Sequence, residues 1–337
     1  MKNKLKHLVP VLLALATITG SLSACELKPK AQQKVSKQGF YFDTIIQITL
    51  YGTTDEKYID DCFDMAKKYE DMLSNTVSYS EVSKINDAAG KEYVTVSDDT
   101  LELIKNGIEY GDTSDGRFDI TIGKLSDLWN FSEIAENTDS KDNEVDASVV
   151  PSDAQIQSEL SHVNYRNIQI NGNDVMLTDS KAKGFIADKM KAYLQSKKIT
   201  SGIINLGGNV LTVGEKSDGS DYTVGIQKPF DESGEPICTV KIKDKSVVTS
   251  GIYERYYRVD GKLYHHILDT TTGYPVKNNL YSVTIISDSS CDGDALSTTC
   301  FALGIDKAKE LINSLSGVEA IFVTDDYSII TTSDEYN

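Results

Sequence analysis

The chain has 337 residues, of which 51 are Asp or Glu and 34 are Lys or Arg, giving a net charge of −17 at pH 7. Hydrophobic residues make up 39% and charged residues 25% of the sequence, which excludes a disordered chain and a bundle of membrane helices. The acidic balance argues against nucleic-acid binding, because contacts to phosphates need clustered lysine and arginine.

The first residues are typical of a bacterial lipoprotein signal. Lysines precede an apolar run over residues 8–19, which at about 12 residues is too short to cross a bilayer as a helix. The signal ends in Leu-Ser-Ala-Cys at 22–25, the pattern of a lipobox, whose cysteine receives the lipid. We expect a signal peptide at 1–24, lipidation of Cys25, a flexible tether over 25–38, and a protein anchored on the extracytoplasmic face of the cell membrane. The alternative is an ordinary secretory signal with an unmodified cysteine.

Hydrophobic periodicity predicts the elements of the first half of the folded part. A β-branched and aromatic run predicts the opening strand, and apolar residues at helical spacing predict the helices. In chain order we expect a strand at 40–51, helices at 56–73 and 98–110 (the latter capped by Asp98 or Asp99), a solvated acidic loop at 133–149, a short helix at 151–160, strands at 168–170 and 175–177, and a helix at 183–196.

The second half alternates more frequently between short apolar runs and turn residues. We expect strands at 203–206, 222–226, 237–242, 246–249, 256–259 and 283–286, helices at 295–303 and 306–315, and a closing hairpin of 320–324 and 327–332. No repeat or linker divides the chain. The sequence therefore predicts an α+β fold with mixed sheets and packed helices, in a single compact catalytic unit over 39–337.

Common nucleotide and hydrolase motifs are absent from the sequence, including the Walker A loop, G-x-G-x-x-G, H-E-x-x-H and G-x-S-x-G. Four polar segments with glycines remain as candidate sites. The segment 115–123 places an arginine and carboxylates in a turn near Trp129, a combination suited to a flat heterocycle and equally compatible with a hairpin turn and a core tryptophan. The segment 180–184 places two lysines at a helix start, as in an anion site, with Asp188 one turn on. Solvated lysines are the alternative.

The other two segments offer acid–base and metal chemistry. His265 and His266 stand before a Gly-Tyr-Pro turn and are candidates for proton transfer, although a hydrogen-bonded structural histidine is the more frequent outcome. Asp294 and Thr298 are four residues apart, so a helix would place a carboxylate and a hydroxyl on one face. Such hard oxygen ligands suit Mg²⁺ and leave positions for phosphate and water. A plain helix cap at Asp294 is the alternative.

Taken in this order, the segments resemble the ApbE family, the bacterial FAD:protein FMN transferases. The similarity runs over 40–332. It is most specific in DGRFDITIGKLSDLW at 115–129, INLGGNV at 204–210, TSGIYERYYRVDGKLYHHILDTTTGYPV at 249–276 and DGDALSTTCFALG at 292–304. The resemblance implies an ApbE-type, T-fold-like architecture. It also implies that the protein binds FAD with Mg²⁺ and transfers the FMN moiety to a Thr or Ser hydroxyl of an extracytoplasmic protein, forming a phosphoester and releasing AMP.

The resemblance also assigns roles to individual residues. It implies metal ligands at Asp294, at Thr298 and at the backbone carbonyl of Ser180, and an acid–base role for His266. It places in the FAD pocket Phe42, Thr76, Arg117, Phe118, Asp119, Lys183 and Leu268. The chain departs from the family pattern where many members carry glycines before Ala-Lys-Gly and it carries Asp179 and Ser180, and where Thr76 replaces an aromatic residue.

The acceptor is expected to be another protein. The family's acceptor motif resembles D-G-x-[ST]-[AST]-T, and the Asp-Gly pairs at 115–116 and 292–293 do not continue in that way. The family implies acceptors among redox proteins of membrane electron-transfer chains. Three alternatives stay open: an FAD pyrophosphatase that makes FMN and AMP, a non-catalytic flavin-binding lipoprotein, and a purely structural lipoprotein.

Overall fold

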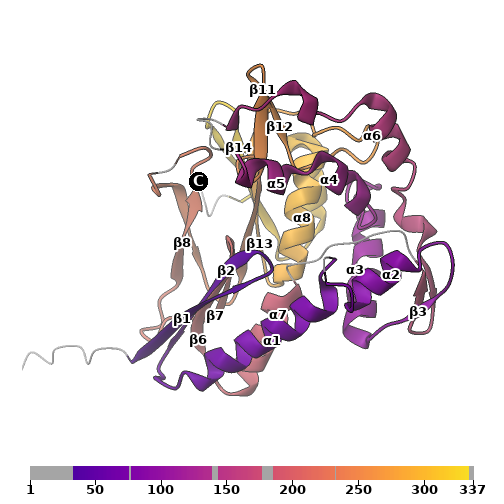
Figure 1. Ribbon diagram of the computed structural model, residues 1–337. Coiled ribbons are helices and arrows are strands. Elements are labelled where there is room, and N and C mark those ends of the chain that lie inside the picture. The colour runs from indigo at the N-terminus through magenta and orange to yellow at the C-terminus, as the bar shows by residue number, and fades with distance from the viewer. Residues whose placement is uncertain (1–32, 76, 139–142, 177–184, 232, 334–337) are drawn as a thin grey trace, which may run out of the picture. The chain divides into compact units, whose positions relative to one another are not determined.

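An antiparallel sheet organises the structure (Figure 1). The computed structural model describes residues 33–75, 77–138, 143–176, 185–231 and 233–333. Within these residues, eight strands form the main sheet, and each pair of neighbours runs antiparallel. In sheet order they are β1 (Lys34–Tyr41), β2 (Thr44–Tyr51), β6 (Ser201–Leu206), β7 (Asn209–Gly214), β10 (Ser246–Gly251), β13 (Leu280–Ser287), β14 (Glu319–Thr324) and β15 (Ile329–Thr331).

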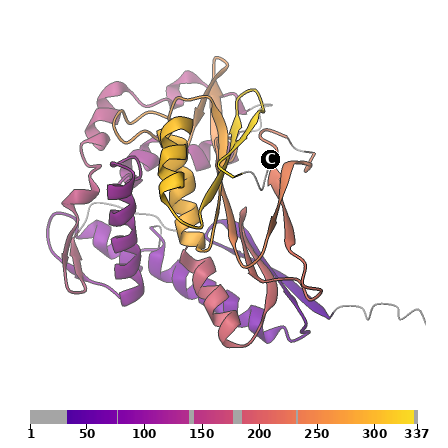
Figure 2. The same cartoon turned by 180° about the vertical axis from the view of Figure 1, so that it is seen from behind.

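The two faces of the main sheet pack against different layers. The covering elements are α1 (Lys57–Leu73), α7 (Phe185–Ser196), α8 (Ser290–Leu303), α9 (Ile305–Ser314), β8 (Tyr222–Gln227) and β9 (Pro236–Ile242). Ile46 and Ile48 of β2 share a core with α1 and α7, while Val283 and Ile285 of β13 share one with α8 and α9. On the other face, the β8–β9 hairpin packs on sheet residues such as Ile286, whose position in β13 alternates with those of Val283 and Ile285. Figures 1 and 2 show the helices and β8 on opposite sides of the sheet.

Smaller units surround the main sheet. A three-stranded sheet packs with one end of α3, and a two-stranded hairpin packs with short helices around an aromatic core. Their elements are α2 (Glu81–Asp87), β3 (Val94–Thr95), α3 (Asp98–Thr113), α4 (Gly123–Trp129), α5 (Phe131–Glu136), η2 (Ala147–Val149), α6 (Asp153–Leu160), η3 (Tyr165–Asn167), β4 (Gln169–Asn171), β5 (Asp174–Met176), β11 (Tyr256–Val259) and β12 (Lys262–His265).

The predicted α+β class, with mixed sheets and packed helices in one compact unit, is confirmed. Gln33–Asn337 forms one such unit. The expected helices at 56–73, 183–196 and 306–315 correspond to α1, α7 and α9, with ends that differ by a few residues at most. Among the described residues, no helix has both the length and the apolar character needed to cross a membrane.

The opening strand is a correction, because the expected strand at 40–51 is a hairpin. Phe42 and Asp43 have φ values of 54° and 56°, the left-handed conformation of a two-residue hairpin turn, and β1 and β2 pair on either side of them. Strand β1 begins at Lys34, inside the segment predicted as a tether over 25–38, because Val35 is buried beneath the sheet and the whole strand pairs with β2. Cys25 lies outside the described residues.

Further differences concern helix starts and unpredicted elements. Helix α3 is capped by Ser97, whose side chain accepts from the Thr100 N–H, and not by Asp98 or Asp99. Helix α8 begins at Ser290, before the expected start at 295. The predicted loop at 133–149 contains most of α5 and all of η2. Strands β7 and β12 and helices α2 and α4 were not predicted.

Candidate active site

Asp294 and Thr298 lie one turn apart on α8, as the spacing predicts. Both are half-buried. The Ser250 hydroxyl of β10 lies 3.1 Å from Thr298 Oγ1 and 2.8 Å from Ser297 Oγ. Helix and strand approach this closely because position 293 is glycine: a Cβ there would lie 2.7 Å from Val248 Cγ2.

The oxygen groups at this position suit a magnesium ion. A carboxylate and hydroxyls are the hard ligands that Mg²⁺ prefers, and the ion keeps several positions for water and substrate phosphates. Among the described residues, no group of three His, Cys, Asp or Glu side chains could hold a metal. An ion here would therefore depend on Asp294, on hydroxyl or carbonyl oxygens, and on its substrate. Ser180, the predicted third contact, lies outside the described residues.

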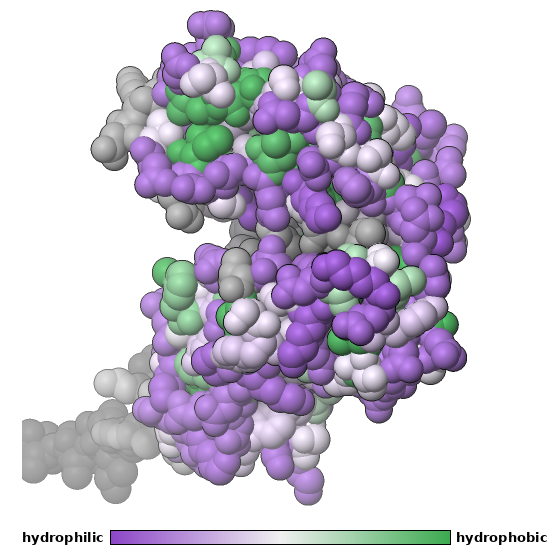
Figure 3. Space-filling view, turned by 45° about the vertical axis from the view of Figure 1, so that its right-hand side comes forward, coloured by the Kyte–Doolittle hydropathy of each residue, from purple (hydrophilic) through white to green (hydrophobic). Residues whose placement is uncertain are grey.

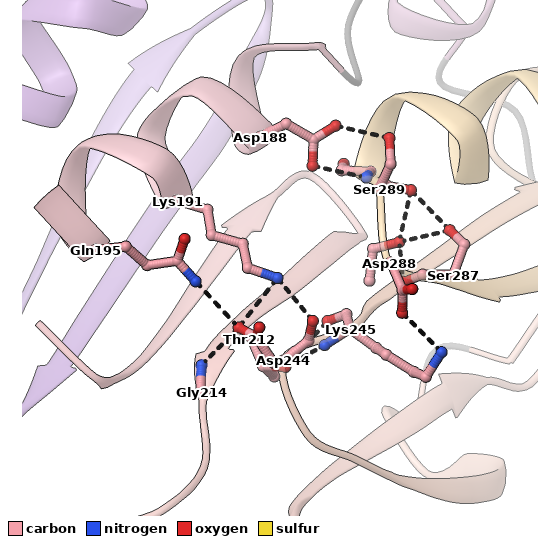
Figure 4. A network of polar contacts seen from close by, with 12 residues as sticks. Asp188, Lys191, Gln195, Thr212, Gly214, Asp244, Lys245, Ser287, Asp288 and Ser289 are labelled. Atoms are coloured by element: carbon pink, nitrogen blue, oxygen red, sulfur yellow. Dashed lines mark hydrogen bonds and ion pairs between the residues drawn. The ribbon is translucent and has the colours of Figure 1, made fainter. Parts of the chain in front are cut away.

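The start of α8 is held by a carboxylate from α7. Asp188 accepts hydrogen bonds from the backbone N–H groups of Ser290 (2.8 Å) and Cys291 (2.9 Å). It also accepts from the hydroxyl of Ser289 at 3.0 Å, a contact that Figure 4 shows. Burial raises the pKa of the Asp188 carboxyl, and these three hydrogen bonds oppose that shift. Two of the N–H groups that a helix start leaves without partners are thus satisfied by a residue about 100 positions earlier in the chain.

The two adjacent histidines have different environments. His265 is buried; its Nδ1 accepts from the Ile267 N–H, so its Nε2 donates to the Val276 carbonyl at 3.0 Å. Burial lowers the pKa of His265 to about 4, and the side chain is a structural one. His266 is half-buried, and its Nδ1 lies 3.2 Å from the Arg255 carbonyl. Because that oxygen is an acceptor, Nδ1 donates and the lone pair is on Nε2.

The turn at 114–119 docks onto the loop that follows the histidines. Thr270 donates its hydroxyl proton to the Gly116 carbonyl at 2.6 Å, and Arg117 pairs with Asp269 at 3.2 Å. Trp129 donates its indole N–H to the Gly273 carbonyl at 2.8 Å. Two of the four segments singled out in the sequence therefore meet in space.

Buried aromatic packing corrects the suggestion that Trp129 could hold a heterocycle. The Trp129 side chain is fully buried and stacks on Phe131 with ring centroids 5.6 Å apart. Leu268, predicted in the FAD pocket, is buried in the same cluster. Asp119 is also buried, and its oxygens accept from the N–H and hydroxyl of Thr121 and from the Tyr165 N–H. In this structure the Asp119 carboxylate holds the turn together.

Phe42 lies at the tip of the β1–β2 hairpin, and its N–H donates to Glu70 Oε1 at 2.8 Å. This tip adjoins the turn between β6 and β7, where a Cβ on Gly207 would lie 2.1 Å from Thr44 Oγ1. The close approach and the φ of 61° both require glycine at 207. Phe42 and the Gly-Gly turn within 204–210, which both belong to the family resemblance in the sequence, are thus neighbours.

Several contact residues were not selected from the sequence. Phe118 packs edge-on against Tyr110 of α3 at 6.1 Å, and the Tyr110 hydroxyl donates to Asp292 of α8 at 2.6 Å. Ser250 belongs to a segment that was singled out, but only the strand register shows that its hydroxyl reaches α8.

The FAD-pocket candidates Thr76 and Lys183 lie outside the described residues. Figure 3 shows a hollow in one face of the molecule, with hydrophobic residues gathered beside it.

Comparison with known proteins identifies relatives over most of the chain. Residues 42–322 match the model of the ApbE family. The chain is 37% identical over 298 residues to the FAD:protein FMN transferase of Klebsiella pneumoniae (strain 342), covering 86% of this chain and 88% of that protein. It is 30% identical over 291 residues to the FAD:protein FMN transferase of Treponema pallidum (strain Nichols), covering 80% and 77%.

Solved structures have the same fold. The ApbE protein from Thermotoga maritima MSB8 superposes with a TM-score of 0.78 at 29% identity, covering 88% of this chain and 96% of that one. The flavin transferase ApbE from Vibrio cholerae gives 0.74 at 24% identity, over 90% and 98%. The alignments cover between 77% and 98% of each of these relatives, and the chain belongs to the ApbE family.

Proposed function

We propose that the protein is an FAD:protein FMN transferase, which uses Mg²⁺ to move FMN from FAD to a Thr or Ser hydroxyl of an extracytoplasmic acceptor protein. The observation that carries the proposal is the oxygen-rich position where α8 meets β10, within a chain that matches transferases over most of its length. There Asp294 and Thr298 would hold the ion, which supplies positive charge against the diphosphate.

In the proposed reaction the acceptor oxygen forms a bond to the FMN-side phosphorus, the bond between that phosphorus and the bridging oxygen breaks, and AMP leaves with the bridging oxygen. The acceptor hydroxyl must lose its proton, and Nε2 of His266 is the proposed base. The contact between Nδ1 and the Arg255 carbonyl supports this role because it keeps the lone pair on Nε2. Arg117, held by Asp269, would orient the turn at 114–119 toward the flavin.

The test combines FAD, Mg²⁺, the chain without its signal and lipid, and a small acceptor domain bearing D-G-x-T-[AST]-T. Flavin fluorescence on a denaturing gel reports transfer, and AMP is assayed in the same reaction. We expect a fluorescent acceptor band with an equal amount of AMP. An acceptor with valine in place of the last threonine controls for bound but unattached flavin.

Each other outcome points to a different function or to an unsuitable acceptor. AMP without a band would show an FAD pyrophosphatase or a wrong acceptor, and neither product with retained FAD would show a binding protein. Asp294→Ala should abolish both products while the circular dichroism spectrum is unchanged. Full activity in Asp294→Ala would refute the metal assignment.

We further propose that the protein is a lipoprotein anchored through Cys25. The lipobox at 22–25 and the short apolar run before it support this proposal. Labelled palmitate should be incorporated into the full chain in bacterial cells and not into Cys25→Ser. Recovery of the unsubstituted chain in the soluble fraction, without label, would refute it.

A further inference from the structure

The first turn of α8 is fixed by side chains from two other helices. Asp188 of α7 accepts from the N–H groups of Ser290 and Cys291. Tyr110 of α3 donates its hydroxyl proton to Asp292 at 2.6 Å. The Asp188 contact satisfies backbone N–H groups of the helix, and the Tyr110 contact holds the Asp292 side chain of the same turn. We call Asp188 and Tyr110 the α8 clamp.

Tyr110 also touches the turn at 114–119, three residues of which the resemblance places in the FAD pocket. Its ring packs edge-on against Phe118, with ring centroids 6.1 Å apart, and it packs against the core shared by β13, α8 and α9. A single side chain thus contacts Phe118, placed in the FAD pocket by the resemblance, and the helix that carries Asp294. The ring serves the first contact and the hydroxyl serves the second, so the two can be separated by one substitution.

We propose that Asp188 and Tyr110 are positioning residues for the divalent ion: they fix the first turn of α8 so that Asp294 and Thr298 are held in place beside Ser250. The inference rests on the metal site of the proposed function. It goes beyond that site because neither clamp residue is itself proposed to touch the ion or the substrate.

The physical reason lies in the position of Asp294 along the helix. Asp294 is two residues after Asp292, within the part of α8 that frays first if the N-terminal turn loses its partners. Thr298 lies a turn further on, where the hydroxyl contact to Ser250 anchors it to the sheet. Because Mg²⁺ requires near-octahedral geometry, a displaced carboxylate weakens binding even when the ligand itself is unchanged.

The test measures ion binding separately from turnover. Mn²⁺ binding to the chain without its lipid is followed by electron paramagnetic resonance, and FAD binding by flavin fluorescence in EDTA. We expect Tyr110→Phe to weaken Mn²⁺ binding by roughly tenfold, the lower end of the range seen when a direct partner of a metal ligand is lost, because Tyr110 acts on Asp294 only through Asp292 and the helix turn. FAD binding should be unchanged, because the ring against Phe118 remains. The Mg²⁺ concentration for half-maximal turnover should rise by the same factor.

Tyr69→Phe is a matched control. The Tyr69 hydroxyl donates to Asp99 at 2.8 Å, a bond of the same type between α1 and the opposite end of α3. Loss of this bond should lower the melting temperature without changing the Mn²⁺ affinity. If Tyr69→Phe weakened Mn²⁺ binding as much as Tyr110→Phe, the effect would be general destabilisation and the proposal would be overturned.

Two further variants locate the effect. Asp188→Asn exchanges one acceptor oxygen for a donor and should weaken Mn²⁺ binding as well. Adding Tyr110→Phe to Asp292→Ala should cost nothing beyond Asp292→Ala alone, because the hydroxyl acts through that carboxylate. Unchanged Mn²⁺ affinity in Tyr110→Phe would overturn the clamp and leave the proposed function standing. Unchanged Mn²⁺ affinity in Asp294→Ala would instead refute the metal site, and the clamp with it.

Discussion

Replacing His265 by glutamine should make the stability of the protein less sensitive to acid. His265 is buried, packs edge-on against Phe301 of α8, and donates from Nε2 to the Val276 carbonyl. Glutamine can keep that donor with its amide and cannot take up a proton. At neutral pH we expect His265→Gln to cost about 1–2 kcal/mol through poorer packing and hydrogen bonding.

The magnitude at acid pH follows from the two pKa values of His265. Burial lowers the pKa from 6.5 to about 4 in the folded protein. Above pH 6.5 the ring is neutral in both states and adds no pH dependence. As the pH falls from 6.5 to 4, the unfolded chain takes up a proton that the folded chain does not, so the free energy of unfolding falls by about 3 kcal/mol. Below pH 4 this loss is complete.

Urea unfolding between about pH 7.5 and pH 4.5 measures this difference, with the fluorescence of Trp129, the chain's one tryptophan, as the probe. Carboxylates elsewhere contribute equally to both proteins, so the wild type minus His265→Gln comparison isolates the ring. We expect the wild type to lose roughly 2–3 kcal/mol more than the variant over this interval. Parallel pH curves would show that His265 is not held neutral and would refute the assignment.

Two other substitutions test the packing around the site. Gly293→Ala should push α8 away from Val248, costing about 1–3 kcal/mol in urea unfolding and most of the FMN-transfer activity; wild-type turnover would contradict the close packing. Trp129→Phe should cost about 2–4 kcal/mol, measured by circular dichroism, because it leaves the Gly273 carbonyl unpaired and a gap in the aromatic core. A loss below about 1 kcal/mol would show that the indole bond contributes little.

The spacing of hydrophobic residues was sufficient to predict elements whose buried residues recur at a regular interval, such as an amphipathic helix. Helix α1 has a regular apolar face, including Ile59, Phe63 and Ala66, and its expected and observed ranges agree to one residue. Strand β7 was not predicted because its short apolar run directly follows Gly207 and Gly208, which indicate a turn. Its place between β6 and β10 depends on pairing with strands distant in sequence.

The start of α8 shows why element boundaries that depend on distant residues were not predictable. The residues from Ser290 to Asp294 are polar and include Gly293, so periodicity places the start at Ala295. In the structure this turn is helical because Ser289 caps it and Asp188, from another helix, accepts two of its N–H groups. A partner about 100 residues away leaves no mark in the local pattern.

The candidate site likewise contains features that local spacing predicts and features that depend on tertiary contacts. The spacing of Asp294 and Thr298 fixes their common face once a helix is assumed, and that prediction needs no tertiary information. The difference between the environments of His265 and His266 has no such local signal, since His265 is the last residue of β12 and His266 is the next residue in the chain. The burial of the His265 ring and the only partial burial of the His266 ring follow from the alternation of side chains at the end of β12.

That alternation links the stability of the fold to the proposed chemistry. With His265 turned into the core against Phe301 and bonded to Val276, the next side chain must turn the other way. His266 then meets the Arg255 carbonyl, which fixes the tautomer that a general base requires. Because the two residues are adjacent, a change that releases His265 from the core also frees the backbone that orients His266. Acid should therefore reduce activity through loss of the buried anchor beside His266.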